Sequence, residues 1–129
     1  MKGLELLEKY PASAKVVRAW FLEKMIESFK DENVPTEFKD YMREQGIDND
    51  KMGTLIDVNP RNLFDVFDAN DIIIETSLYP NGEFTIKIGN QATTNSWKTR
   101  KEAELFAIEA AFEILENKLT PKEETNENE

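Results

Sequence analysis

Apolar positions recur with helical spacing through the first two-thirds of the chain. Segment 12–30 contains no helix breaker, and its apolar residues spread around most of the helical circumference. They are Val17, Trp20, Phe21, Leu22, Met25, Ile26 and Phe29. A helix that is apolar on several sides is either central to its domain or shared with a second subunit. The second alternative predicts self-association through Trp20, Phe21 and Met25, with Trp20 as the anchor near the interface axis.

Three shorter helices are expected next. Pro35 suits the first position of a helix over 36–45, which Gly46 ends. A second helix is expected in DNDKMGTLIDV, residues 48–58. Asn59 and Pro60 then form a cap and first residue for a helix over 60–68.

The period of the pattern changes at Asp71. IIIETSLY is β-branched and aromatic, PNG is a turn, and EFTIKI alternates apolar and polar residues, which together predict a hairpin. A third short strand is expected within 92–97. Thr99 and Glu102 form a capping box for a final helix. Its predicted apolar face holds Leu105, Ile108, Phe112, Leu115 and Leu119, and its opposite face holds Glu102, Glu109, Glu113 and Glu116.

These elements predict an α+β fold. An N-terminal helical layer accompanies a small antiparallel sheet of two or three strands, and the C-terminal helix packs on that sheet. We expect residues 1–119 to form one domain and the acidic segment 120–129 to be a disordered tail, because that segment has low apolar content and four glutamates.

The amino-acid composition limits the cellular compartments and the classes of partner that we expect for this protein. The 129 residues include no cysteine and carry a formal charge of −10. The N-terminus lacks the long apolar run of a signal peptide, and no segment approaches a membrane span, so we expect a cytoplasmic protein without membrane contact. A negative chain repels phosphate backbones, which makes nucleic acid an unlikely partner.

The sequence lacks the residue types that most catalytic and metal sites use. Without histidine or cysteine, the Ser-His and Cys-His nucleophiles and the usual zinc sites are excluded. Asp48, Asp50 and Gly53 resemble the start of a calcium loop, but Met52 and Asn59 stand where that loop requires oxygen ligands. We therefore expect neither an enzyme nor a bound cofactor or metal.

Residues 44–66, EQGIDNDKMGTLIDVNPRNLFDV, resemble the helix-turn-helix of phage-repressor-type regulators. The apolar and small positions of that motif are matched by Met52, Gly53, Ile56, Val58, Leu63 and Val66. Asp57 departs from it, since the motif usually has glycine there. The resemblance implies DNA contact through Arg61 and Asn62, but the aspartates of the same helix would repel phosphates. Two packed core helices therefore explain the pattern better than a DNA-binding motif does.

The C-terminal third resembles the second half of a double-stranded-RNA-binding domain. It runs strand, turn, strand, loop and helix, with Lys98, Arg100 and Lys101 at the helix start. In that family, basic residues here contact phosphates. Each cation at a helix N-terminus destabilises the helix by about 0.3 to 1 kcal/mol, because it lies at the positive end of the helix dipole. We therefore expect a negatively charged partner that compensates for this cost. That partner is either an internal acid, such as Glu102, Glu104 or the tail, or an external anion or acidic surface, held together with Trp97.

The chain opens with KYPASAKVVRAWFLEKM near its N-terminus and ends on short strands and a helix. In these features it resembles small acidic proteins of bacteriophages and mobile elements, a likeness that implies no activity. The leading interpretation is a non-enzymatic protein-interaction module whose partner is another protein or a second copy. The alternatives are a nucleic-acid-associated protein and an acidic inhibitor that mimics nucleic acid.

Overall fold

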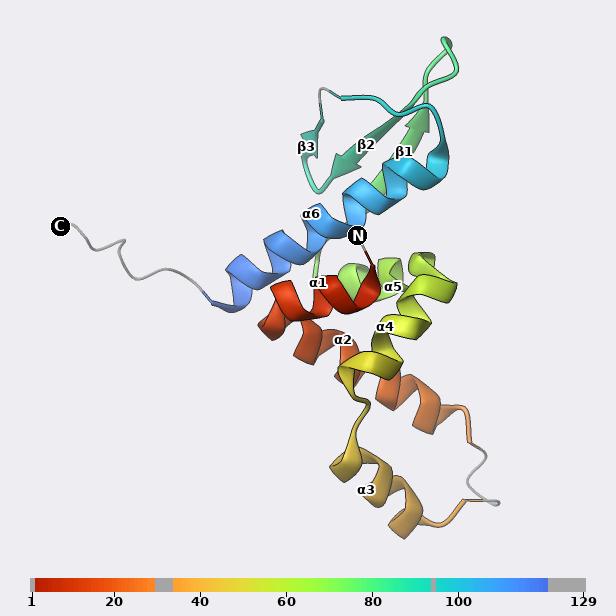
Figure 1. The fold of residues 1–129 in the computed structure, drawn as a ribbon, viewed down its shortest axis with the longest axis vertical. Coiled ribbons are helices and arrows are strands. Elements are labelled where there is room, and N and C mark those ends of the chain that lie inside the picture. The colour runs from red at the N-terminus through yellow and green to blue at the C-terminus, as the bar shows by residue number, and fades with distance from the viewer. Residues whose placement is uncertain (1, 30–33, 94, 121–129) are drawn as a thin grey trace, which may run out of the picture.

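The computed structural model describes residues 2–29, 34–93 and 95–120, and confirms the α+β class (Figure 1). The acidic segment 121–129 lies outside the described residues. The elements are α1 (Gly3–Lys9), α2 (Pro11–Glu27), α3 (Thr36–Gln45), α4 (Asn49–Val58), the 3-10 turn η2 (Pro60–Asn62), α5 (Leu63–Ala69), β1 (Ile74–Leu78), β2 (Phe84–Ile88), β3 (Gln91–Ala92) and α6 (Arg100–Leu119). In the described chain, no helix has the length and apolar character to cross a bilayer.

Helix α1, which the sequence pattern did not single out, crosses α4 at two glycines. A Cβ built on Gly3 would lie 2.5 Å from the carbonyl oxygen of Gly53, and one built on Gly53 would lie 2.8 Å from the backbone nitrogen of Leu4. The N–H of Gly3 donates to Asp57 Oδ1 at 2.8 Å. Asp57 therefore satisfies the first backbone N–H of α1 from a different helix.

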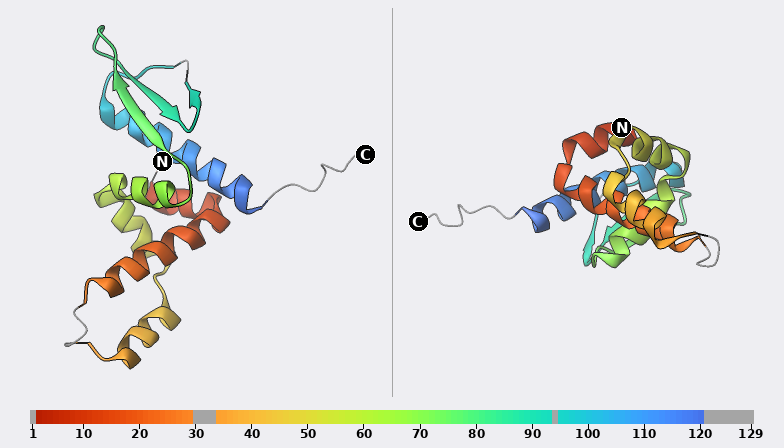
Figure 2. Two further views of the ribbon diagram at one scale, coloured as in Figure 1. Left: turned by 180° about the vertical axis from the view of Figure 1, so that it is seen from behind. Right: turned by 90° about the horizontal axis from the view of Figure 1, so that it is seen from below.

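Helix α6 is the centre of the molecule, with the sheet on one side and the N-terminal helices on another (Figures 1 and 2). Thr99 caps it by accepting from the Glu102 N–H at 3.1 Å, as predicted. The predicted apolar face is partly wrong, because Leu105 and Leu119 are 39% and 42% exposed. Ile108, Phe112 and Leu115 are buried as predicted, and Ala103, Glu104, Ala107 and Ala111 are buried beside them. The small alanine side chains let neighbouring elements approach α6 closely. A prediction from hydropathy alone misses them, because it assigns the buried face to the large apolar residues.

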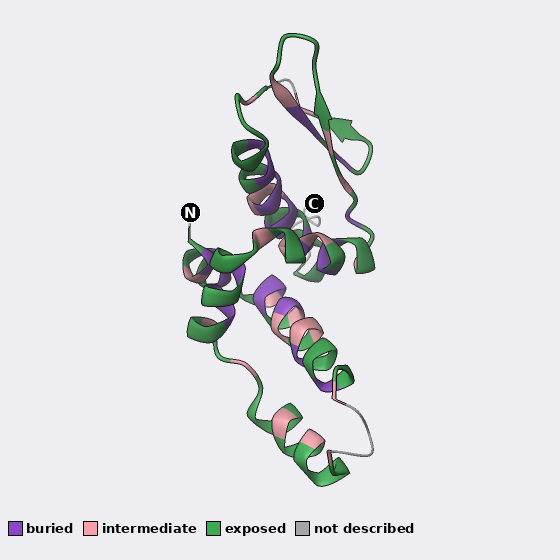
Figure 3. Cartoon of the chain, turned by 90° about the vertical axis from the view of Figure 1, so that its right-hand side faces the viewer, coloured by how far each residue is buried: buried purple, intermediate pink, exposed green. Residues whose placement is uncertain are grey.

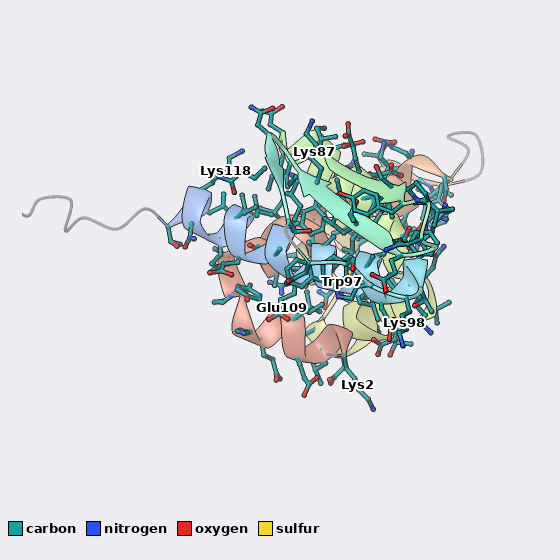
Figure 4. The ribbon with its side chains drawn as sticks, turned by 90° about the horizontal axis from the view of Figure 1, so that it is seen from above. Lys2, Lys87, Trp97, Lys98, Glu109 and Lys118 are labelled. Carbon is teal, nitrogen blue, oxygen red and sulfur yellow. The ribbon has the colours of Figure 1, made fainter. Side chains whose placement is uncertain are left out.

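Two glutamates predicted to face solvent on α6 instead hold the α1–α2 corner. Glu109 accepts from Lys9 Nζ at 2.9 Å and from the Tyr10 hydroxyl at 3.3 Å (Figure 4). The contact with Glu109 raises the pKa of Lys9, while burial raises the pKa of Tyr10. Glu116 accepts from the backbone N–H groups of Ala12 and Ser13, at 3.1 and 2.8 Å. These groups open α2 directly after Pro11, where they have no partner within the helix.

Glu116→Ala is expected to lower the free energy of unfolding by about 1–2 kcal/mol, because both N–H groups lose their acceptor at the positive end of α2. Glu113→Ala, an exposed change on the same helix, should stay within about 0.5 kcal/mol of wild type. Urea unfolding of the two variants measures the difference. Equal losses would show that Glu116 does not cap α2.

The sheet has the order β1-β2-β3 and is antiparallel throughout. The predicted hairpin is confirmed, with Ile74 opposite Ile88 and Leu78 opposite Phe84, and Gly82 takes the left-handed conformation in the turn (φ 88°). The third strand is shorter than predicted. It covers Gln91–Ala92, and Trp97 forms a separate bridge with Phe84.

Helix α3 stands apart from this body. It begins at Thr36, one residue after Pro35, and ends before Gly46, whose φ of 73° stops the helix. With the second half of α2 it forms a helical hairpin that projects away from α6 and the sheet, whereas the first half of α2 packs on α6 (Figures 1 and 2). Figure 3 shows only half-buried and exposed residues on α3, and none of its ten residues is buried.

Candidate functional site

The exposure of α3 is unusual for a helix of its length. Phe38, Tyr41, Met42 and Gln45 lie on one side at helical spacing, yet Phe38 and Tyr41 are 48% and 57% exposed. A ten-residue helix is marginal in water unless an apolar face is packed. The apolar side of α3 is therefore a surface that a further element can cover.

A groove runs between this side of α3, the second half of α2 and the outer side of α4. Its volume is about 670 Å³, within the range of natural binding pockets. The lining residues are Leu22, Met25, Tyr41, Met42, Gln45, Gly46, Ile47, Asp50, Lys51, Thr54 and Leu55. We call this feature the α2–α3–α4 groove. Met25, Tyr41 and Leu55 are the exposed large apolar residues among its lining.

The groove is apolar and carries no net charge. Asp50 and Lys51 are the charged residues among its lining, one negative and one positive, whereas the whole chain carries −10. The groove thus offers burial of apolar area rather than a field that selects a charged ligand.

An ion pair links the two arms of the hairpin. Arg43 on α3 donates to both carboxylate oxygens of Glu23 on α2, at 2.9 and 3.3 Å, and Asp40 lies 3.4 Å from the same guanidinium. The contact with Glu23 raises the pKa of Arg43. These side chains are about half exposed, so the contact stabilises weakly and leaves the groove open.

The residues predicted for self-association separate into two environments. Met25 lines the groove and is 39% exposed. Trp20 and Phe21 are half-buried, pack against the core and meet edge to face at 5.1 Å. Lys24 Nζ lies 5.3 Å from the centre of the Trp20 ring. One part of α2, at Met25, is therefore left uncovered by its own chain, whereas Trp20 and Phe21 are partly covered.

The residues predicted as an anion or partner contact lie at the start of α6, where Figure 4 shows Trp97 and Lys98. Trp97 is half-buried against Phe106, with ring centroids 4.8 Å apart. The guanidinium of Arg100 lies over the Phe84 ring at 5.6 Å. Lys98 and Lys101 are exposed, and no ion pair to either occurs among the residues that the structure describes.

The fold brings Arg61 beside this basic cluster. Arg61, Arg100 and Lys101 border a hollow of about 380 Å³ that Asp57 and Glu104 also line. Arg61 Nε lies 3.4 Å from Glu104 Oε2, and Glu104 is buried. Residues from both nucleic-acid resemblances thus meet at one place, but two carboxylates share it. Val58, an apolar core position of the helix-turn-helix pattern, is 78% exposed here.

Comparison with protein families, curated proteins and solved structures finds no match to this chain. Within residues 2–29, 34–93 and 95–120, no three acidic side chains converge as ligands for a metal ion.

Sequence reasoning missed most of the groove. Tyr41, Met42, Ile47 and Leu55 come from three segments, and their convergence depends on how α3 is placed against α4. One usable signal was present, because the aromatic and methionine residues of α3 share one side of a helix that is otherwise charged.

Proposed function

We propose that this protein is a non-enzymatic protein-interaction module that binds an apolar helical segment in the α2–α3–α4 groove. The observation that carries the proposal is α3, a helix with no buried residue that holds one wall of an open apolar groove. Grooves between helices that are lined by methionine, leucine and aromatic side chains suit the apolar face of an amphipathic helix.

Nucleic-acid binding has weaker support from the same residues. Glu104 already pairs with Arg61, Asp57 lines the same hollow, and the chain as a whole repels phosphates. For an acidic inhibitor that mimics nucleic acid, residues 2–29, 34–93 and 95–120 offer no feature comparable to the groove.

The methionines offer a direct test of the groove. Met25 and Met42 line it, whereas Met52 is fully buried in the core and serves as an internal control. Methyl NMR spectra of dilute protein would be recorded during titration with a synthetic amphipathic helical peptide of no net charge. We expect the Met25 and Met42 signals to shift together and saturate, while the Met52 signal stays in place.

Two outcomes would contradict the proposed function. One is the absence of any shift at Met25 and Met42 when the peptide reaches about 1 mM. At that concentration even a complex with a dissociation constant of about 1 mM would be detected. The other is an equal shift at Met52, which would indicate that the peptide disturbs the core.

A further inference from the structure

We infer that the occupant of the α2–α3–α4 groove is the α2–α3 hairpin of a second copy of this chain, so that the two hairpins pair as a four-helix bundle. This inference rests on the proposed function and names the partner of the same site. The self-association contact that the sequence predicted at Trp20 is thereby placed at Met25 and at residues of α3 and α4.

The shape of the groove favours a second copy. In an isologous interface one surface must both supply and receive side chains. Met25, Tyr41 and Leu55 are exposed where they line the groove, while Leu22 and Ile47 are more enclosed. This one surface therefore carries protruding apolar side chains from α2, α3 and α4 beside a hollow that such side chains can enter. Methionine and tyrosine are also enriched in the cores of protein interfaces.

The electrostatics point the same way. A groove built for a basic or acidic partner would present unpaired charge of the opposite sign. Here Asp50 and Lys51 cancel, and Arg43 already pairs with Glu23 and Asp40 in its own chain. The groove lining therefore adds no net repulsion between two copies, although the rest of each chain is negative.

The hairpin also provides the right elements. Helix α3, with ten residues, and the second half of α2 project beyond α6 and the sheet, while the start of α2 is held against α6 by Glu116 (Figures 1 and 3). Two such hairpins bury their open sides by packing face to face, as four-helix bundles do. Pairing gives α3 the buried face that it lacks in one copy.

The test compares Leu55→Glu with Val58→Glu by sedimentation equilibrium over roughly hundredfold dilution. Both residues are exposed and apolar and both lie on α4, but Leu55 lines the groove and Val58 does not. We expect wild type and Val58→Glu to dimerise equally, and Leu55→Glu to raise the dissociation constant at least about tenfold. Thermal midpoints of the variants check that each one folds.

The salt dependence of association distinguishes pairing of two copies from binding of an oppositely charged foreign partner. Because each copy carries −10, raising NaCl from about 0.05 to about 0.5 M screens their repulsion and should tighten the dimer. A constant monomer mass at every salt concentration, or equal weakening by both variants, would overturn the inference. If the wild type stays monomeric and the peptide still shifts Met25 and Met42, the proposed function stands and only the second copy falls.

Discussion

Gly53→Ala is expected to lower the free energy of unfolding by about 3 kcal/mol, at the upper end for a substitution that overfills a packed contact. In an exposed helix interior the same change stabilises by about 0.5–1 kcal/mol. The sign reverses here because the added methyl would meet the backbone nitrogen and Cα of Leu4, at 2.8 and 3.0 Å. Backbone atoms do not rotate away, so α1 and α4 must separate.

Urea unfolding of Gly53→Ala measures this loss, with Glu8→Ala as a control on the exposed side of α1. The control should remain within about 0.5 kcal/mol of wild type. Gly3→Ala should behave like Gly53→Ala, since its Cβ would lie 2.5 Å from the Gly53 oxygen. The double variant should lose less than the sum, because both changes disturb one crossing. A neutral or stabilising Gly53→Ala would show that the helices do not cross this closely.

Phe112→Ala is expected to cost about 3–5 kcal/mol, as large-to-small changes in a core do. Phe112 is fully buried on α6, and its ring lies 5.8 Å from Tyr10 and 5.4 Å from Phe67. It thus joins α6 to the α1–α2 corner and to α5. Because small domains have only about 5–15 kcal/mol of stability, this one change takes much of it.

Phe106→Ala is the matched control for Phe112→Ala, since it removes the same atoms from the same helix. Phe106 is 40% exposed and contacts Trp97, so its loss should cost about 1–2 kcal/mol. Chemical denaturation followed by circular dichroism measures both. If Phe106→Ala costs more than Phe112→Ala, the centre of the core lies elsewhere.

Local patterns predicted the elements well, because their signals lie within a few residues of one another. The turn at Gly82, the cap at Thr99 and the stop at Gly46 each depend on one residue's conformation or hydrogen bond. Those signals set the hairpin, the start of α6 and the end of α3.

Tertiary partners decided what the local patterns missed. Glu116 looked like a solvent-facing residue, yet it caps α2 from about a hundred residues away in sequence. Leu105 fits the helical projection of an apolar face, but alanines on α6 are buried instead, since small side chains permit the close packing. The groove could not be predicted from local patterns either, because its walls come from three helices whose packing is set by tertiary contacts. Of its residues, the sequence indicated Met25 alone as a contact.

Photo-crosslinking from inside the groove tests the central claim, that a second copy of the chain occupies it, most directly. The chain has no cysteine, so Gln45→Cys carries a benzophenone label at one position on the groove wall, and Glu113→Cys carries it on the exposed side of α6. With purified protein, irradiation should give covalent dimers from the Gln45 position, with crosslinked peptides from α2, α3 or α4 of the second copy. The Glu113 position should give monomers. Dimers from Glu113 with none from Gln45 would contradict the account.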